Sequence, residues 1–368
     1  MESAVRVLHV IGSMDRGGAE TFLMNVYREI DRTKVQFDFL ISSPTKTYYE
    51  DEIIALGGNI HRMPRRIPNY PKHCKFIDSF FKNNKYQIVH QHSNSCVAIS
   101  TLIYAKKNKV NKIIFHSHSS KTNGNFSDKL FDFIYKSKIK KYATDYFACS
   151  ELAGENLFGK YIDKDQIKII NNGIRTENYA FNKDVRAIYR EKLGISDKFV
   201  VGHVGNFTAP KNHSFLIDVF SEIYNMNNNS VLLLVGDGSL RKEAEYKVAK
   251  LGLADRVIFA DVRSDIQELL CAMDVFVFPS LYEGLGIVLI EAQTCGLRCI
   301  SSNVIPREAQ VTNLLECISL DETSKVWAAK VISSSKLLDR KTMSEAVALA
   351  GFDAKDVAFQ LQKLYLDR

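Results

Sequence analysis

PSLYEGLGIVLIEAQTCG, residues 279–296, is the stretch that decides the fold. It follows an apolar run with strand character, Val275 to Phe278, and passes through a loop with two glycines into a helical pattern. A strand, a glycine loop and a helix start form a place where backbone N–H groups point at an anion. Glu283 and Glu291 stand eight residues apart, one before the helix and one inside it. Such a pair could hold hydroxyl groups at two ends of a phosphate-linked ligand, although an ordinary strand–helix unit with solvated acids has the same pattern.

Length and composition favour an enzyme with two domains. The chain has 368 residues, 46% hydrophobic and 25% charged, which is enough for two cores and ordinary for a globular protein. No apolar run approaches the roughly 20 residues of a membrane span, and Val5 to Ile11 suits a first strand better than a signal peptide. The seven cysteines are scattered without zinc-finger or CxxC spacing, which predicts reduced thiols in a cytoplasmic protein.

Positive charge is concentrated in the first half of the chain. Residues 1–182 carry 27 Lys and Arg against 18 Asp and Glu, whereas the remainder carries 22 against 24. A one-sided basic domain can attract phosphate-rich partners or an anionic membrane face, so we expect a cytoplasmic protein that can lie peripherally on the inner face of the cell membrane. Solvated helix ends and loops would give the same count. No basic motif interleaved with aromatic residues indicates nucleic acid.

Strands and helices alternate along the whole chain. Strands are predicted at residues 5–11, 37–41, 88–90, 113–116, 146–149, 167–170, 199–205, 231–235, 257–259 and 275–278. Because these are continuous apolar runs, they predict parallel sheets covered by helices on both faces. The pattern restarts after a polar stretch, which predicts an α/β protein with two Rossmann-like, doubly wound domains at residues 1–180 and 181–349 and a helical tail at 350–368. Ligands would then bind beyond the carboxyl ends of the strands, in a cleft between the domains.

The stretch 279–296 resembles the E-x7-E motif of the family 4 retaining glycosyltransferases, which have the GT-B fold. The resemblance includes the apolar strand, the Pro-Ser pair, the Glu-Gly-x-Gly loop and the Ile-Glu-Ala inside the helix. It implies that Glu283 is catalytic and orients the sugar, that Glu291 binds ribose hydroxyls, and that the terminal helix crosses back to the first domain. It also implies that backbone amides hold the donor diphosphate, at Gly284, Leu285, Gly286, Ile287 and Val288.

Gly17 and Gly18 follow the first predicted strand. A glycine pair before a helix suits a phosphate or sugar ring held against backbone amides, although such turns also have purely structural uses. The spacing is not that of the GxGxxG dinucleotide fingerprint. Family 4 members commonly have a G-G-A-E loop here, which implies that Gly17 and Gly18 close on the donor and that Arg16 contacts the acceptor or the sugar.

The segment 204–213, VGNFTAPKNH, opens the second predicted domain. Family members usually have an Arg after the glycine and a Lys shortly downstream, and both neutralise the leaving diphosphate. Lys211 matches that lysine, which implies a catalytic role, whereas Asn206 takes the position of the arginine and brings no charge to the donor site. Losing one cation could weaken transition-state stabilisation unless another replaces it, such as Arg16 or Arg263. Arg263 also stands where the family places contacts to the nucleobase.

Paired histidines follow two predicted strands, His90 and His92 after one and His116 and His118 after another. Two residues apart at a strand end, such pairs could bind a metal, contact a sugar or pack in loops. Because no matched Asp, Glu or Cys accompanies them, we expect no metal site. In the family a histidine after the later strand contacts the donor sugar, which implies that role for His118, with His116 as second choice because the register is ambiguous.

The resemblance covers nearly the whole chain, and matches at residues 20–25, 36–40 and 301–308 are similar to the capsular and exopolysaccharide branch of the bacterial family. It implies a hexosyltransferase that moves a sugar, with retention of configuration, from a nucleotide-sugar to an acceptor. The first choice of donor is a UDP-sugar, and the acceptor is a saccharide or a polyprenyl-phosphate-linked oligosaccharide. The acceptor would attack from the face that the diphosphate leaves, and a phosphate oxygen would take its proton. Neither a metal nor another cofactor is then needed, because the main catalytic task is to stabilise the leaving group.

Alternative functions stay open at this point. A UDP-sugar 2-epimerase shares the GT-B fold but uses no acceptor, and the E-x7-E stretch with its glycine loop favours the transferase. A catalytically weak partner subunit that binds nucleotide is supported by Asn206, and a large rate gain from Asn206→Arg would indicate a weakened enzyme instead. A nucleic-acid binder is a third class, which the acidic second half of the chain argues against.

Overall fold

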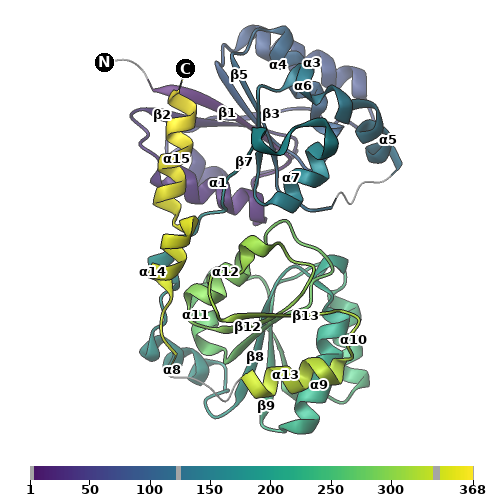
Figure 1. The fold of residues 1–368 in the computed structure, drawn as a ribbon, viewed down its shortest axis with the longest axis vertical. Coiled ribbons are helices and arrows are strands. Elements are labelled where there is room, and N and C mark those ends of the chain that lie inside the picture. Colours follow the sequence, from purple (N-terminus) through teal and green to yellow (C-terminus); the bar gives the residue numbers. More distant parts are fainter. Residues whose placement is uncertain (1–3, 122–125, 335–339, 368) are drawn as a thin grey trace. The chain divides into compact units, whose positions relative to one another are not determined.

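Parallel strands form two separate sheets in the computed structural model, which describes residues 4–121, 126–334 and 340–367 (Figure 1). Each sheet belongs to its own structural unit. Unit 1 comprises Met1–Ile174 with Gly351–Arg368, and unit 2 comprises Arg175–Ala350. In both units hydrophobic clusters lie on the two faces of the sheet, under the helices that cover it. The prediction of an α/β protein with two doubly wound parallel sheets is therefore confirmed.

The sheet of unit 1 has the strand order β3-β2-β1-β4-β5-β6-β7, and the order reverses between β1 and β4. Its strands are β1 (Val5–Ile11), β2 (Val35–Ile41), β3 (Ile60–Arg62), β4 (Ile88–His92), β5 (Lys112–Ser117), β6 (Asp145–Ala148) and β7 (Ile167–Ile169). Its helices are α1 (Gly18–Glu29), α2 (Glu50–Ala55), α3 (Tyr70–Asn83), α4 (Ile99–Lys107), α5 (Phe126–Tyr135), α6 (Ile139–Tyr142), α7 (Glu151–Phe158) and α15 (Ala354–Leu366).

Helix α15 brings the end of the chain onto the first sheet. Val357, Leu361 and Tyr365 join the same buried cluster as Val7 of β1 and Phe22 of α1. The side chain of Asp353 accepts a hydrogen bond from the Lys355 N–H, which caps the start of the helix. Helices α1 and α15 therefore cover the same face of the sheet.

Unit 2 has the strand order β10-β9-β8-β11-β12-β13, which reverses between β8 and β11. Its strands are β8 (Phe199–Val204), β9 (Ser230–Val235), β10 (Val257–Phe259), β11 (Val275–Phe278), β12 (Arg298–Ser302) and β13 (Leu315–Ile318). Its helices are α8 (Lys183–Lys192), α9 (His213–Met226), α10 (Arg241–Lys250), α11 (Ile266–Ala272), α12 (Ile287–Thr294), α13 (Ser324–Ser334) and α14 (Ser344–Val347), with 3-10 turns η5 (Thr176–Tyr179) and η6 (Ala209–Lys211).

Alternation along the central strands of unit 1 decides which side chains share a face. On β1, Val7 and Ile11 join the cluster under α1 and α15, whereas Leu8 and Val10 join the cluster on the other face. Because successive side chains on a strand point to opposite faces, His9 lies on the face of Val7 and Ile11. The histidines of β4 and β5 follow the same rule, since Ile88 and Ile114 belong to that cluster too.

No helix in the described part of the chain is long and apolar enough to cross a membrane. The seven cysteines are free, and Cys271 Sγ lies 3.5 Å from Cys295 Sγ in the core of unit 2.

Candidate functional site

Lys211 and Glu283 form an ion pair just beyond β8 and β11, the two neighbouring strands at which the order of unit 2 reverses. Lys211 Nζ lies 2.6 Å from Glu283 Oε1 and 4.7 Å from the centroid of the Phe278 ring. The two side chains are only 20% and 12% exposed, so solvent screens their attraction less than on an open surface. In open α/β sheets, ligands bind at the carboxyl ends of the strands where the order reverses.

Two hydrogen bonds join the loop after β8 to the loop after β11. Leu281 N–H donates to the Pro210 carbonyl at 2.8 Å, and Asn212 Nδ2 donates to the Pro279 carbonyl at 3.2 Å. These bonds fix the separation of two segments that lie far apart in the sequence. Lys211 is therefore held opposite the glycine loop by a backbone hydrogen bond at Pro210 and a side-chain hydrogen bond from Asn212.

Helix α12 begins directly after this loop. Gly286, at its N-terminus, has φ +82°, a left-handed conformation that favours glycine. No side chain caps the helix at that position, and the first amides of a helix have no partner within the helix itself. Leu285 is buried and anchors the loop to the core. Residues 284–288 thus present backbone N–H groups and the positive end of a helix dipole, which suits an anion.

Glu291 lies inside α12 and is buried. Its Oε1 accepts a hydrogen bond from the Tyr179 hydroxyl at 2.8 Å. Burial raises the pKa of the Glu291 carboxyl to about 7, while the bond from Tyr179 acts in the opposite direction. Close to neutral pH, Glu291 is therefore divided between a neutral form and a carboxylate that accepts hydrogen bonds from hydroxyl groups.

Asn206 and Arg263 are both exposed at the ends of strands in unit 2. Arg263 donates two hydrogen bonds to the carboxylate of Asp265, at 2.8 and 2.5 Å, so its guanidinium is already engaged with an acid. Gly205 precedes Asn206, and a Cβ at Gly205 would lie 3.2 Å from Cγ and Cδ of Lys211. Glycine at that position therefore leaves room for the Lys211 side chain beside β8.

In unit 1, Gly17 forms the N-cap of α1. A Cβ there would lie 2.2 Å from Glu20 Oε2, whereas a Cβ at Gly18 would meet nothing within 4 Å. A side chain at Gly17 would therefore displace the Glu20 carboxylate from its present position, and Gly18 leaves the backbone open beside it. The Arg16 guanidinium lies over the Tyr48 ring, 3.9 Å from its centroid, as in a cation–π contact.

His118 and His116 have different surroundings, although they are only two residues apart. His118 is partly exposed; its backbone N–H donates to Asn94 Oδ1 at 2.8 Å and its Nε2 lies 2.8 Å from His92 Nδ1. His116 is fully buried in β5, with Nδ1 3.1 Å from His90 Nε2. Burial lowers the pKa of His118 to about 3 and the pKa of His116 well below its usual range. Both rings are therefore neutral at physiological pH.

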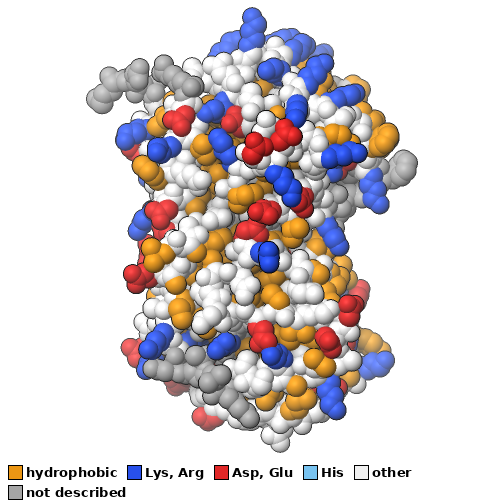
Figure 2. Space-filling view, viewed as in Figure 1, with side chains coloured by type: hydrophobic (Ala, Val, Ile, Leu, Met, Phe, Trp, Pro, Cys, Tyr) orange, Lys and Arg blue, Asp and Glu red, His pale blue; other side chains and the backbone are white. Residues whose placement is uncertain are grey.

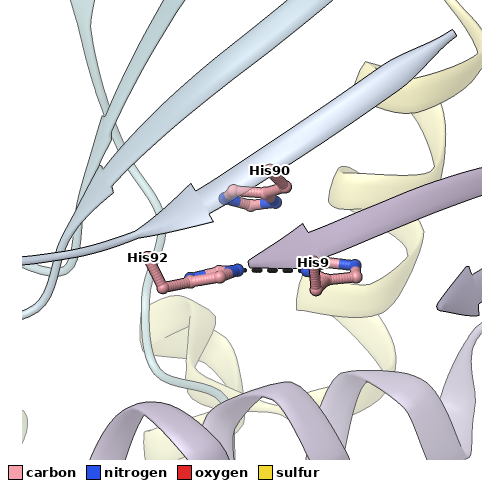
Figure 3. A group of neighbouring side chains, drawn as sticks. All are labelled: His9, His90 and His92. Carbon is pink, nitrogen blue, oxygen red and sulfur yellow. Dashed lines mark hydrogen bonds between the residues drawn. The ribbon is translucent and has the colours of Figure 1, made fainter. Parts of the chain in front are cut away.

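His9, His90, His92, His116 and His118 form a cluster of five histidines. Figure 3 shows three of them, His9 on β1 with His90 and His92 on β4. Ring nitrogens of His9, His90 and His92, and likewise of His92, His116 and His118, lie within 4.8 Å of one another. Three imidazoles are a ligand set that zinc accepts. However, the ring nitrogens already pair at hydrogen-bond distances, which are 3.0 Å for His9 and His92, 2.8 Å for His92 and His118, and 3.1 Å for His90 and His116. Tetrahedral zinc would separate its nitrogen ligands by about 3.3 Å. The arrangement fits a hydrogen-bond network better than a metal centre.

Three residues of these sites were missed by sequence reasoning: His9, Tyr179 and Tyr365. Tyr365 on α15 lies with its hydroxyl 2.7 Å from His90 Nδ1. His9 is a single histidine inside an apolar strand, and Tyr179 stands next to the domain boundary predicted at residues 180 and 181. The paired histidines of β4 and β5 carry a visible signal, but a single residue joined to them only by the fold does not.

Two family models match the chain. Residues 16–178 match the model described as Glycosyltransferase Family 4, and residues 185–340 match the model described as Glycosyl transferases group 1. The first match lies in unit 1, apart from residues 175–178, and the second lies in unit 2.

Relatives and solved structures match over nearly the full length. EpsF of Bacillus subtilis, named as a glycosyltransferase, is 34% identical over 99% of this chain and 97% of its own. CapH of Staphylococcus aureus, a capsular polysaccharide biosynthesis glycosyltransferase, is 26% identical over 99% of both chains. A galactosyltransferase of Escherichia coli, named for UDP-Gal and α-D-GlcNAc-diphosphoundecaprenol, is 28% identical over 90% of this chain and 89% of its own. The structure of Anabaena HepE with UDP and glucose superimposes with a TM-score of 0.80 at 20% identity, covering 99% of this chain and all of that one.

Proposed function

The chain belongs to the family 4 glycosyltransferases of the GT-B fold that act in polysaccharide biosynthesis, and we propose that it transfers a hexose from a UDP-sugar with retention of configuration and without a metal ion. The acceptor in this proposal is a saccharide or a polyprenyl-phosphate-linked oligosaccharide. The observation that carries the proposal is the ion pair of Lys211 and Glu283 beside the uncapped start of α12.

The ion pair supports a diphosphate site. Lys211 Nζ already lies 4.7 Å from the Phe278 ring in a partly desolvated position, where a second anion would feel its charge strongly. A diphosphate at the start of α12 would meet the amides of residues 284–288 and this lysine together. Both groups stabilise the negative charge that develops as the sugar–phosphate bond breaks, and such preorganised donors contribute most of the rate in many enzymes.

Retention follows in this proposal from attack on the face that the diphosphate leaves. The acceptor hydroxyl forms the new glycosidic bond as the bond to the phosphate oxygen breaks, and that oxygen takes the hydroxyl proton. Glu283 orients the sugar through its hydroxyls, and Lys211 and the amides hold the leaving group. The charge on the diphosphate is then balanced by protein groups, so the proposal needs no metal.

Glu291 supports the nucleotide end of the same proposal. Its carboxyl lies in the same helix that begins at Gly286, and its ionised form can accept hydrogen bonds from the two ribose hydroxyls. The E. coli relative is named for a UDP-sugar donor, which favours uridine as the base. Its name also includes a diphosphoundecaprenol acceptor, which favours a lipid-linked acceptor for this chain.

An acceptor in a membrane requires contact with the membrane surface, and α5 supports this. Leu130, Phe133 and Ile134 are 47%, 84% and 39% exposed on that helix. Exposed lysines follow in the sequence or stand on the same helix, at Lys129, Lys138, Lys140 and Lys141. Figure 2 shows Lys and Arg side chains over the part of unit 1 that carries α3, α4 and α5. Exposed apolar side chains together with exposed lysines suit an anionic bilayer face, so we propose a cytoplasmic enzyme that binds peripherally to the inner membrane face.

The transfer proposal is tested by Glu283→Gln and Lys211→Met. Each substitution removes one charge from the pair, and we expect kcat to fall by about 10²- to 10³-fold, the usual cost of losing one preorganised group at a developing charge. Transfer from UDP-sugars to an undecaprenyl-diphosphate-linked sugar would be measured with EDTA present. Lys330→Met is the matched control, because Lys330 also forms a 2.6 Å ion pair, with Glu316, at a surface position on α13. Wild-type rates in Glu283→Gln would refute the assignment, and a requirement for added divalent cation would refute metal independence.

The membrane proposal is tested by co-sedimentation with phosphatidylglycerol vesicles. Reversing the charge of Lys138 and Lys140 should weaken binding at least tenfold, because each basic residue near an anionic surface contributes about 1 kcal/mol. Phe133→Ser should weaken it as well, whereas Phe359→Ser, an equally apolar change at a 63% exposed site on α15, should not. Equal binding to phosphatidylcholine vesicles, or no effect of the lysine changes, would contradict the proposal.

A further inference from the structure

Two thiols and a guanidinium lie together in the core of unit 2, at the carboxyl ends of α11 and α12. Cys271 belongs to α11, and Cys295 is the C-cap of α12. Their sulfur atoms are 3.5 Å apart, and Arg340 Nη2 donates to Cys295 Sγ at 3.0 Å. We propose that this thiol pair is a redox modification site, at which hydrogen peroxide joins Cys271 and Cys295 in a reversible disulfide bond. The proposal goes beyond sugar transfer and concerns unit 2 by itself.

The separation of the two sulfur atoms allows a bond with little movement. Cys271 and Cys295 are 24 residues apart in the sequence, yet their side chains are in contact. Because a disulfide bond is about 2.05 Å long, the sulfurs must approach each other by about 1.5 Å. Shared between two side chains, this is a shift of less than about 1 Å for each sulfur. The bond would tie the end of α11 to the end of α12.

Arg340 places a positive charge beside the thiol pair. Its guanidinium donates five hydrogen bonds, and four of them go to the main-chain carbonyls of Leu270, Cys271, Met273 and Cys295, at 2.8 to 3.1 Å. The fifth goes to Cys295 Sγ. None of these five acceptors is a carboxylate, so carbonyl dipoles and a sulfur atom balance the guanidinium charge here. A cation in such a position favours the thiolate form of a neighbouring cysteine.

The two sulfur atoms have different roles. The hydrogen bond with Cys295 lowers the pKa of the Cys271 thiol, against the effect of burial, and the charge of Arg340 acts in the same direction as that bond. The pKa of Cys295 is raised, first by its hydrogen bond with Cys271 and then by burial. Cys271 is therefore the thiolate, and Cys295 is the thiol that donates to it. Cys271 is also 3% exposed whereas Cys295 is not exposed at all, so an oxidant reaches Cys271 first.

The reaction proceeds in two steps. The Cys271 thiolate attacks one oxygen of hydrogen peroxide, the O–O bond breaks, and hydroxide leaves while Cys271 becomes a sulfenic acid. The sulfur of Cys295 then attacks the sulfenic sulfur, the S–O bond breaks, and the hydroxyl group leaves as water with the proton of the Cys295 thiol. Arg340 stabilises the negative charge on Cys295 in this step, because its Nη2 already contacts that sulfur. A dithiol reverses the reaction by thiol–disulfide exchange.

A cavity of about 640 Å³ gives a small oxidant access to this part of unit 2. Its lining includes Met273, Gly296 and Arg340. Gly296 directly follows Cys295, and Arg340 contacts its sulfur. Hydrogen peroxide has only two heavy atoms, so it can enter a space of this size and approach the thiol pair.

Peptide mapping of the full-length protein tests the bond directly. The reduced protein is treated with hydrogen peroxide, denatured in an alkylating reagent that blocks free thiols, and digested. We expect a linked pair of peptides that contain Cys271 and Cys295, which dithiothreitol returns to free thiols. Cys299 is the matched control and should stay reduced, because it is buried in the same cluster but donates to the Leu297 carbonyl at 3.3 Å. Oxidation of Cys299, or of the exposed Cys317, without that link would overturn the proposal.

Variants of the three residues test the order of the steps and the role of the cation. In Cys295→Ser the sulfenic acid cannot be resolved, so dimedone added with denaturant should label Cys271, whereas Cys271→Ser should leave Cys295 unlabelled. Label on Cys295 would reverse the two roles and overturn the assignment. Arg340→Met should slow formation of the bond by about tenfold or more, because a neighbouring cation raises the thiolate fraction. Arg298→Met is its matched control, since Arg298 lines the same cavity, and equal rates in both variants would overturn the role of Arg340.

Unit 2 should become more stable when the bond forms. The single tryptophan, Trp327, is buried in this unit, so its fluorescence reports the unfolding of unit 2. A bond between residues 24 apart should raise the midpoint of thermal unfolding by roughly 5–10 °C, and dithiothreitol should abolish the rise. An equal rise in Cys271→Ser, or a lower midpoint in the oxidised wild type, would overturn the proposal. If Arg340→Met does not fold, peptide mapping and this midpoint still decide the matter, and neither depends on sugar transfer.

Discussion

The two units share a strand order around the reversal point and yet carry opposite kinds of chemistry there. In unit 1, five histidines lie on β1, on β4 and at the end of β5. Their rings are mostly buried and are all neutral at physiological pH. In unit 2, the loops after β8 and β11 carry an ion pair, and α12 holds a buried acid. The same strand order thus holds hydrogen-bonded neutral rings in unit 1, and an ion pair beside the N-terminus of α12 in unit 2.

This difference gives Glu291 of unit 2 the opposite response to pH from the histidines of unit 1. A buried histidine whose folded pKa lies below its unfolded value of 6.5 lowers the stability of the protein as the pH falls below 6.5. The reason is that the unfolded chain then binds more protons than the folded chain. For His9 and His118, with folded pKa values of about 3, stability is lost progressively between pH 6.5 and about 3. Glu291 behaves in the opposite way, since its folded pKa of about 7 exceeds the unfolded value of 4.5. The folded state therefore loses stability at Glu291 as the pH rises from 4.5 to 7.

The largest effect that we expect is acid unfolding of unit 1. At pH 5, each buried histidine costs up to about 2 kcal/mol, from the 1.5 units between pH 5 and the unfolded pKa. Five coupled rings can then consume most of the 5–15 kcal/mol that stabilises an ordinary domain. Amide exchange in peptides from β1, β4 and β5 should report the loss of protection between pH 6.5 and 5.

Unit 2 supplies the internal reference for that experiment. The single tryptophan, Trp327, is buried in unit 2, so its fluorescence follows that unit alone. Unit 2 also holds two buried histidines with lowered pKa values, His203 and His213, but only two against five. Exchange in unit 1 should therefore rise at a higher pH than the change in Trp327 fluorescence. Simultaneous transitions, or constant stability between pH 6.5 and 5, would show that the histidines do not distinguish the units.

The sequence carried more information about local elements than about contacts between them. The apolar runs that precede residues 12 and 279 predicted strands, and the structure has β1 and β11 at these places. Paired histidines two residues apart in β4 and β5 also had a clear reason to share a face, because strand side chains alternate. Local pattern and backbone chemistry act over a few residues, so a single sequence displays them.

Contacts made by the fold had no such signal. His9 meets His92 across 83 residues, and His90 meets Tyr365 across 275 residues, so neither pair has a spacing to read. Lys211 and Glu283 were each predicted from a motif, but their ion pair depends on two hydrogen bonds between loops that no motif contains. Arg263 was considered as a replacement cation, and its engagement with Asp265, two residues away, shows only in the structure.

A smaller effect is expected at Glu291 of unit 2, where the charge of one buried acid should control the pH dependence of UDP binding. If the Glu291 carboxylate accepts hydrogen bonds from ribose hydroxyls, UDP binding needs the ionised form. UDP affinity should then rise with pH through about 7 and level off above it, whereas the stability contribution of Glu291 in the absence of ligand falls over the same range. Glu291→Gln should bind UDP about tenfold more weakly at pH 8 and lack this pH dependence, as calorimetric titration would measure. Because the ionisation of UDP itself is common to both proteins, the difference between them isolates the residue.

Tyr179→Phe tests the cause of that pKa with the acid left in place. The Tyr179 hydroxyl donates to Glu291 Oε1 and favours the ionised form, so its removal should shift the rise in UDP affinity to higher pH. In the same variant, stability in the absence of ligand should fall further between pH 4.5 and 8 than in the wild type, whose loss at Glu291 is limited to about 3 kcal/mol by the 2.5-unit shift. A pH profile of UDP binding that is the same in wild type, Tyr179→Phe and Glu291→Gln would mean that Glu291 is a structural acid. Glu291 would then contribute to the stability of unit 2 but not to UDP binding, and its difference from the histidines of unit 1 would concern stability alone.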